Sequence, residues 1–115
     1  RAVGWVEGTA RPGEPGNIGI AGHRDGFFRG LKDVRPGDAL ELAIPGGSRT
    51  YRIDRIRVVK PQDVRDLEPT TIPTVTLITC YPFYFVGSAP ERYIVRATLA
   101  DARASMARED NVPLR

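Results

Sequence analysis

The residues of this 115-residue chain best suited to chemistry are its single cysteine and its single histidine. Cys80 ends an apolar run over residues 76–80, and Pro82 follows, so we expect Cys80 where a buried strand gives way to a loop. His23 follows a run of alternating isoleucine and glycine and is expected at the end of another strand. Neighbouring strands can bring such ends together. A Cys–His pair for acyl transfer is then available, with a thiolate attacking a carbonyl and imidazole handling the proton of the leaving amine.

Acyl transfer also needs a donor for the oxyanion of its tetrahedral intermediate, and an arginine is well suited to that task. Arg92 opens the last predicted strand, which a hairpin-like connection from Cys80 could lay beside the cysteine strand. Arg96 lies on the same face by parity, further from the strand end. Cys80, His23 and Arg92 are therefore the candidate catalytic residues.

Each of these residues also has an ordinary structural interpretation. A free cysteine in an apolar run usually packs as a small hydrophobic residue. His23, beside Arg24 and Asp25, could be a loop histidine, and Arg92 could be one of many surface arginines. Asp25 could orient the imidazole, although alternate loop residues need not face each other. Spacing alone leaves both interpretations open.

The composition indicates one domain with a modest core and excludes several functions. Twelve glycines and ten prolines favour short strands joined by turns. The 17 basic and 14 acidic residues give a net charge of +3 without a basic cluster or a zinc-ligand spacing, so we expect no nucleic-acid partner. One cysteine makes no internal disulfide. No apolar run reaches the roughly 18 residues of a membrane span, and no secretory signal is present. Because the chain opens on Arg1 without methionine, we expect an excised soluble piece whose anchor could lie upstream.

The pattern of apolar residues and turns predicts an all-β fold with one or two short helical turns. A parity switch between Ile53 and Ile56 predicts a bulge near Asp54. Seven or eight short strands without α/β alternation favour a closed or nearly closed β-barrel, with a β-sandwich as the alternative. The predicted strands cover residues 2–7, 18–22, 39–44, 51–58, 75–80 and 93–99, and the helical turns fall within 25–32 and 63–67.

Three segments of the chain resemble the sortases, the cysteine transpeptidases of bacterial surfaces. Residues 76–80 (TLITC) resemble the signature around the sortase cysteine, residues 17–23 (NIGIAGH) its histidine segment, and residues 92–97 (RYIVRA) its arginine segment. The order of the three also matches. The continuations CYPF after the cysteine and SAPER before the arginine look most like class D sortases.

The resemblance implies a closed eight-stranded sortase-type barrel over residues 1–100, followed by a tail over 101–115 that is a short helix or disordered. It implies a membrane-anchored parent protein on the extracytoplasmic face of the bacterial membrane. It also implies cleavage of a Leu-Pro-X-Thr-Gly or Leu-Pro-X-Thr-Ala sorting signal after threonine. The acyl group would form a thioester with Cys80 and pass to an amine of a cell-wall precursor or a pilin lysine.

The resemblance assigns a role to each matching position. Cys80 matches the nucleophile, His23 the general acid/base and Arg92 the oxyanion or substrate clamp. Residues 60–74, the longest segment without strand character, fall where sortases have the loop that covers the Leu-Pro part of the signal. The expected substrate-binding residues are Thr79 beside the nucleophile, Val64 and Leu67 on that loop, and Ala21 and Ile78 on the groove floor.

No metal or cofactor is expected. Calcium-stimulated class A sortases use carboxylates in a hairpin loop that here reads PGGS, at residues 45–48. Two alternatives remain. An L,D-transpeptidase would place a His-Gly pair before the cysteine, where this chain has Ile78 and Thr79. A non-enzymatic binding barrel would use Cys80 as a structural residue.

Overall fold

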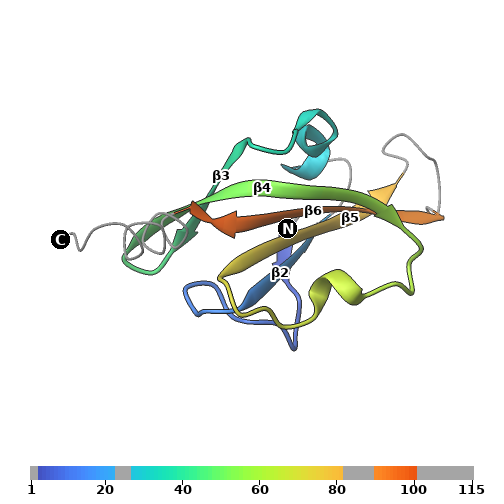
Figure 1. Cartoon of the computed structure of the whole chain (residues 1–115). Coiled ribbons are helices and arrows are strands. Elements are labelled where there is room, and N and C mark those ends of the chain that lie inside the picture. The colour runs from blue at the N-terminus through green and yellow to red at the C-terminus, as the bar shows by residue number, and fades with distance from the viewer. Residues whose placement is uncertain (1–2, 23–26, 82–89, 101–115) are drawn as a thin grey trace.

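The computed structural model describes residues 3–22, 27–81 and 90–100, which form one curled six-stranded sheet (Figure 1). Its strand order is β1-β2-β5-β6-β4-β3. Two 3₁₀ helices, η1 and η2, interrupt the strands. The elements are β1 (Val3–Trp5), β2 (Asn17–Gly22), η1 (Phe27–Asp33), β3 (Ala39–Ile44), β4 (Gly47–Val59), η2 (Arg65–Leu67), β5 (Thr74–Tyr81) and β6 (Glu91–Leu99).

The expected all-β class and the two short helical turns are confirmed, but the expected count of eight strands is not. The described residues contribute six strands, and β1 and β3 are the two ends of the sheet order. Each of the six segments predicted as strands overlaps a strand of the structure, so only the expected total differs. The tail predicted for 101–115 lies outside the described residues.

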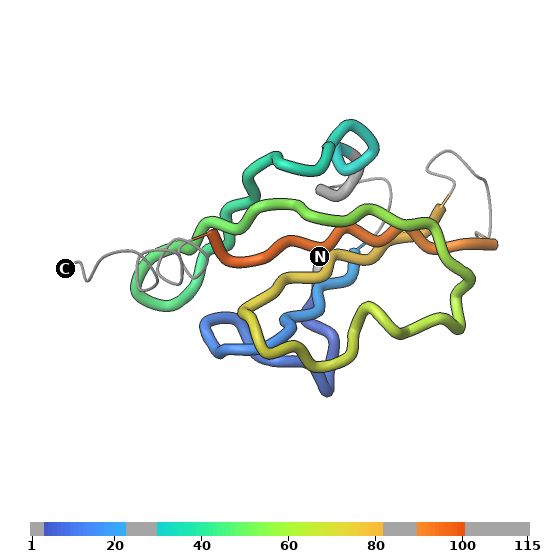
Figure 2. The backbone as a smooth tube through the Cα atoms, in the orientation of Figure 1, coloured from blue at the N-terminus to red at the C-terminus, as the bar shows by residue number. Residues whose placement is uncertain are grey.

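One pairing inside the sheet joins strands that lie far apart in the sequence. β2 runs parallel to β5, with Ile18 opposite Val75 and Ala21 opposite Ile78. Figure 2 shows the two segments side by side, the blue β2 next to the yellow β5. β5 then pairs antiparallel with β6. Strand β5, which carries Cys80 one residue before its end, is therefore held on both sides, as a rigid support for a reactive group should be.

The bulge predicted near Asp54 is confirmed. The β4–β6 register pairs Ile53 with Ala97 and then Arg55 with Arg96, so Asp54 is the extra residue. The shift returns Ile56 to the face of the sheet that Ile53 occupies. Without it, the apolar residues of the second half of β4 would point away from the core.

One face of the sheet carries the hydrophobic core, and we call it the core face. Ile18, Tyr51, Val75 and Val95 are fully buried there. Helix η1 lies on this face, because the Tyr93 hydroxyl donates a 3.1 Å hydrogen bond to its Leu31 carbonyl. Burial is the main cause that raises the pKa of Tyr93, and the nearby Tyr81 and Asp33 add to it.

The opposite face carries Asn17, Thr76, Cys80 and Arg92, and we call it the outer face. The strand registers place Asn17 opposite Thr74, Thr76 opposite Arg96 and Cys80 opposite Arg92. Helix η2 packs here, through contacts described below. The two short helices therefore cover opposite faces of the sheet (Figure 1).

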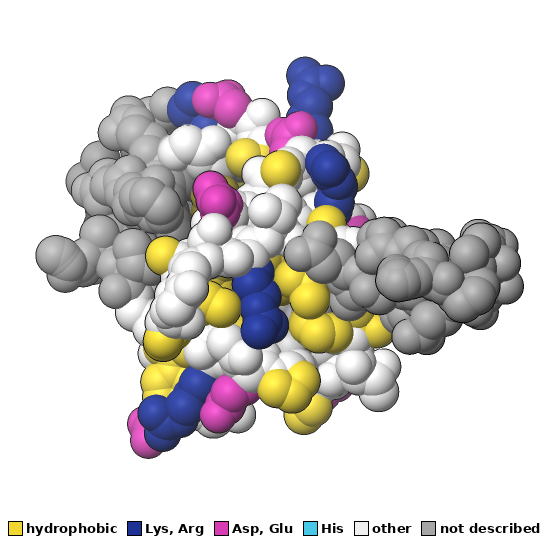
Figure 3. All heavy atoms as spheres, turned by 90° about the vertical axis from the view of Figure 1, so that its left-hand side faces the viewer, with side chains coloured by type: hydrophobic (Ala, Val, Ile, Leu, Met, Phe, Trp, Pro, Cys, Tyr) yellow, Lys and Arg dark blue, Asp and Glu magenta, His cyan; other side chains and the backbone are white. Residues whose placement is uncertain are grey.

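Charged side chains of both signs mix on the surface that Figure 3 shows. Acidic side chains lie near basic ones, and hydrophobic side chains lie between them. In the described part of the chain, no helix is long and apolar enough to cross a membrane.

Candidate active site

Cys80 and Arg92 are direct cross-strand partners at the open end of the β5–β6 pair. Directly opposed residues of an antiparallel pair share one face, with Cβ atoms about 4.5–5.5 Å apart. Both residues are half-buried. Both line one pocket of about 180 Å³ on the outer face. The sequence-predicted pairing of cysteine and arginine is therefore present in the structure.

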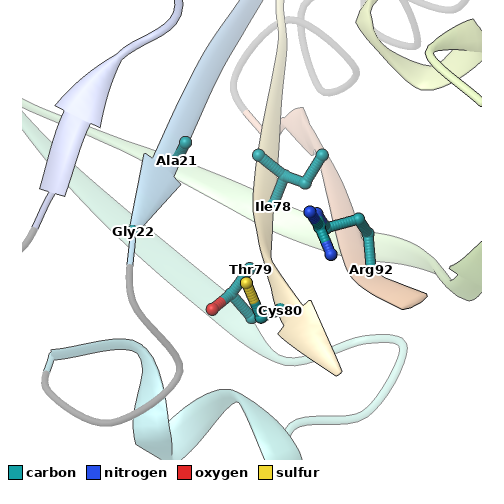
Figure 4. Close-up of a pocket in the computed structure, with 6 residues that line it drawn as sticks. All are labelled: Ala21, Gly22, Ile78, Thr79, Cys80 and Arg92. Carbon is teal, nitrogen blue, oxygen red and sulfur yellow. The ribbon is translucent and has the colours of Figure 1, made fainter. Parts of the chain in front are cut away.

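The rest of the pocket is small and apolar. Ala21 and Gly22 contribute one wall from the end of β2, and Ile78 contributes from β5. Figure 4 shows the Arg92 side chain reaching from β6 toward Ile78 and Cys80, with Ala21 on the far side of β5. One Arg92 nitrogen, Nη1, donates a 2.9 Å hydrogen bond to the Glu91 carbonyl.

His23 lies outside the described residues. Its chain neighbour Gly22 is described, and Gly22 lines the same pocket as Cys80. Asp25 also lies outside the described residues. The backbone that leads into His23 therefore reaches the pocket, and the role of the histidine stays a prediction.

Thr79 lines the pocket, but its side chain lies on the core face, opposite to that of Cys80. Only 3% of Thr79 is exposed, and its buried hydroxyl has no hydrogen-bond partner among the described residues. An unpaired buried hydroxyl lowers stability. Buried hydroxyls of this kind are uncommon, and this one lies next to Cys80 near the end of β5.

Helix η2 is fixed to the outer face through Asp66, whose side chain is only 4% exposed. The carboxylate accepts hydrogen bonds from Arg55 Nη2 at 2.8 Å and from Arg57 Nη2 at 2.8 Å. The Asp66 carbonyl accepts hydrogen bonds from Asn17 Nδ2 at 2.7 Å and Thr76 Oγ1 at 3.1 Å. Strands β2, β4 and β5 all hold this short helix.

The two predicted apolar residues of this loop differ in their surroundings. Leu67 is half-buried and packs over β2, where a Cβ built on Gly19 would meet Leu67 Cδ2 at 2.9 Å. Glycine at position 19 therefore makes room for the leucine. Val64 is 57% exposed and stands at the start of η2, without a partner that would bury it.

A second carboxylate of this loop, Asp63, is held by an exposed arginine. Arg65 donates to it from Nε at 3.0 Å and from Nη2 at 2.7 Å. These hydrogen bonds lower the pKa of Asp63 well below its ordinary value. Arg57 also approaches Asp63, at 3.7 Å. Asp63 is thus paired with an arginine at the surface, whereas the buried Asp66 is paired with two arginines of β4.

The contacts of Asp66 are the feature of this surface that the sequence analysis missed. The interpretation of residues 60–74 rested on Val64 and Leu67 as apolar contacts and assigned nothing to the acid between them. One signal was present in the sequence. Arg55 and Arg57 sit at alternate positions of a predicted strand, so both point to one face and require an acidic partner if that face is covered.

The described residues offer no group of three or more His, Cys, Asp or Glu side chains that could hold a metal ion. The acids of residues 63–66 are instead neutralised by arginines.

Comparisons with known proteins agree on one family. The model of the sortase domain matches residues 1–100. Sortase D of Bacillus subtilis (strain 168) is 37% identical over 102 residues, which cover 83% of this chain and 48% of that protein. The chain thus spans about half the length of this curated relative.

Solved structures give the same result. The Sortase D5 transpeptidase of Clostridium perfringens has a TM-score of 0.74 at 34% identity, over 84% of this chain and 61% of that one. Sortase C1 of Streptococcus agalactiae has a TM-score of 0.77 at 32% identity, over 86% of this chain and 53% of that one. The barrel is therefore of the sortase type, which excludes the sandwich and the L,D-transpeptidase alternatives. The chain belongs to the sortase family and is most like class D within it.

Proposed function

We propose that this domain is a transpeptidase that cleaves a Leu-Pro-X-Thr-Gly or Leu-Pro-X-Thr-Ala sorting signal after threonine. The observation that carries the proposal is the direct opposition of Cys80 and Arg92 in one pocket. Membership of the sortase family supports the reaction class. The similar Clostridium perfringens protein is described as a transpeptidase.

In the first half of the reaction, the Cys80 thiolate attacks the carbonyl carbon of the signal threonine. Arg92, on the neighbouring strand, donates hydrogen bonds to the oxyanion that forms. His23, as the general acid, gives a proton to the leaving nitrogen while the C–N bond breaks. The products are a thioester on Cys80 and a free amine on the carboxy-terminal fragment.

The second half reverses these roles. An incoming amine attacks the thioester carbonyl, and His23 accepts its proton. The C–S bond breaks, a new amide forms, and Cys80 returns to its starting state. The acceptor class is a primary amine from a cell-wall precursor or a pilin lysine. The parent protein would act outside the cytoplasm, attached to the membrane through a segment beyond this domain.

The outer face offers a track for the amino-terminal part of the signal. Thr76, Ile78 and Cys80 lie on this face at successive alternate positions of β5, so Thr76 and Cys80 are about 13 Å apart. An extended peptide covers that distance in about four residues. A threonine at Cys80 therefore places the Leu-Pro pair near η2, with Ala21 and Ile78 below it and Val64 and Leu67 beside it.

The test is a transfer assay with a small amine. Incubation of the domain with a Leu-Pro-X-Thr-Gly peptide and hydroxylamine should give a peptide that ends in threonine hydroxamate, identified by mass spectrometry. A peptide with the same residues in scrambled order should give no product. A folded domain that converts no member of a Gly/Ala library of sorting peptides would contradict the proposal.

A second assay separates the enzyme from a binding barrel. If Cys80 is the nucleophile and His23 its acid/base partner, His23→Ala should change the rate at which a thiol reagent modifies Cys80, and should also change the pH profile of that rate. Slow modification that His23→Ala leaves unchanged would favour a structural cysteine.

A further inference from the structure

We infer that Asp66 is a positioning residue for substrate recognition, which holds η2 so that Val64 and Leu67 form one wall of the signal-binding groove. The inference rests on the proposed function and adds a residue to it. Arg55, Arg57 and the Asn17 amide hold Asp66 in place. Asp66 itself does not touch the reacting atoms.

The first support is the completeness of the contacts at the Asp66 carboxylate. One oxygen, Oδ1, accepts from Arg55 at 2.8 Å. The other, Oδ2, accepts from Arg57 Nε at 3.1 Å and from Arg57 Nη2 at 2.8 Å. The arginines are partly exposed while the carboxylate is buried, so the ion pairs fix the loop residue against the sheet. Charge-assisted bonds of this kind are stronger and more directional than neutral ones.

The second support is a polar network beneath the backbone of η2. Asn17 Nδ2 donates to the carbonyls of Asp66 at 2.7 Å and Glu68 at 2.8 Å. Thr76 Oγ1 lies 2.7 Å from Asn17 Oδ1 and 3.1 Å from the Asp66 carbonyl. Asn17 and Thr76 are both buried. The main chain and the side chain of Asp66 are therefore held independently by different strands.

The third support is the distance from these contacts to the pocket. On β5, Thr76 contacts η2. The next residue on the same face of β5 is Ile78, which lines the pocket. On β2, Gly19 lies under Leu67. The next residue on the same face of β2 is Ala21, which lines the pocket. One alternate-residue step on a strand is about 6.6 Å, so η2 borders the pocket directly. A small shift of η2 would move one wall of the groove.

The test compares kcat/KM of Asp66→Asn with that of the wild-type domain on a Leu-Pro-X-Thr-Gly peptide. We expect kcat/KM to fall about 10- to 100-fold, mainly through a higher KM, because misplacement of a binding wall by about 1 Å has effects of this size. On a peptide with Ala-Ala in place of Leu-Pro, the two proteins should differ by less than threefold. A general structural defect would slow both peptides equally.

A matched pair of arginine variants keeps the test independent of how well Asp66→Asn folds. Arg57→Gln removes a partner of the buried Asp66, and Arg65→Gln removes an exposed partner of Asp63, since the Arg65 side chain is 70% exposed. Arg57→Gln should reproduce the peptide-dependent loss, and Arg65→Gln should stay within threefold of wild type. Amide hydrogen exchange at residues 64–67 should be faster in Asp66→Asn and Arg57→Gln alone.

The outcomes separate this inference from the proposed function. A wild-type domain that processes no sorting peptide contradicts the proposed function. An active wild type whose Asp66→Asn and Arg57→Gln variants keep kcat/KM on the Leu-Pro peptide contradicts the positioning role alone. Equal losses on the Leu-Pro and Ala-Ala peptides also contradict it, because they indicate a purely structural residue.

Discussion

Cys80 and Arg92 face each other across the antiparallel β5–β6 pair, one residue before β5 ends and one residue after β6 begins. The separation of Cys80 and Arg92 is therefore fixed by the backbone hydrogen bonds between β5 and β6. A nucleophile and an oxyanion donor need this kind of support, because their geometry must hold before the substrate arrives.

Replacement of Arg92 tests the oxyanion role. Arg92→Gln should lower kcat about 100- to 1,000-fold, the loss typical when one oxyanion donor is removed. Arg96→Gln is the matched control: Arg96 lies on the same strand and face but pairs with Asp54, at 3.4 Å. It should change kcat by less than threefold. Equal losses in both variants would show that positive charge on this face matters, and not the position of Arg92.

Gly19 gives a packing prediction for the wall of the groove. In Gly19→Ala, the new Cβ would meet Leu67 Cδ2 at 2.9 Å, Thr9 Cγ2 at 3.0 Å and Val6 Cβ at 3.2 Å. Such overpacking costs about 1–3 kcal/mol of the free energy of unfolding, measurable by urea denaturation. Gly4→Ala is the control, because a Cβ there meets nothing within 4 Å. A Gly19→Ala domain as stable as Gly4→Ala would contradict the close packing of η2.

Two threonines of β5 should respond oppositely to the same substitution. The Thr76 hydroxyl bonds to Asn17 and to the Asp66 carbonyl, so Thr76→Val should cost about 1–3 kcal/mol of unfolding free energy. Within the described part of the chain the Thr79 hydroxyl has no partner, so Thr79→Val should leave that free energy unchanged or raise it. Chemical denaturation of both variants measures the difference. A destabilised Thr79→Val domain would show that its hydroxyl is paired after all.

Thr79→Val also tests whether this residue serves the reaction. Because the Thr79 side chain lies on the core face, opposite to that of Cys80, we expect Thr79→Val to change kcat by less than threefold. A loss of about tenfold or more, the worth of one hydrogen bond, would show that the hydroxyl reaches the reacting carbonyl. An unchanged kcat would restrict Thr79 to packing beside the nucleophile.

Calcium and chelators should leave the activity unchanged. The arginines Arg55, Arg57 and Arg65 already neutralise the acids of the η2 loop. The turn at residues 45–48 carries no carboxylate that could complete a calcium site. Hydroxamate formation measured with EDTA and with millimolar calcium should therefore agree within error. A severalfold rise with calcium would contradict this expectation.

Local patterns in the sequence predicted much of the fold. Alternation over residues 39–44 gave β3 with its bounds, and the parity switch in the next strand gave the bulge at Asp54. The cysteine strand and the arginine strand were expected side by side, and the structure pairs them. These features depend on periodicity and turn chemistry, which a single sequence carries.

The long-range features were not predictable in the same way. Nothing local in Ile18 or Val75 indicates that their strands run parallel to each other. The expected count of eight strands rested on the family resemblance and on the number of short apolar segments. The described residues form six strands. Asp66 was not identified because its partners, Arg55 and Arg57, lie 11 and 9 residues earlier, on strand β4. Thr79 was expected to bind substrate as the chain neighbour of Cys80, and strand alternation places its side chain on the core face, opposite to that of Cys80.

The central claim, that Cys80 carries the acyl group, is tested most directly by intact mass spectrometry of the acid-quenched domain. After a brief incubation with a sorting peptide, the wild-type domain should gain the mass of the peptide up to threonine, minus water, and fragmentation should place that mass on Cys80. Cys80→Ala should stay folded, gain no mass and show no turnover. An adduct on another residue, or turnover by Cys80→Ala, would contradict the mechanism.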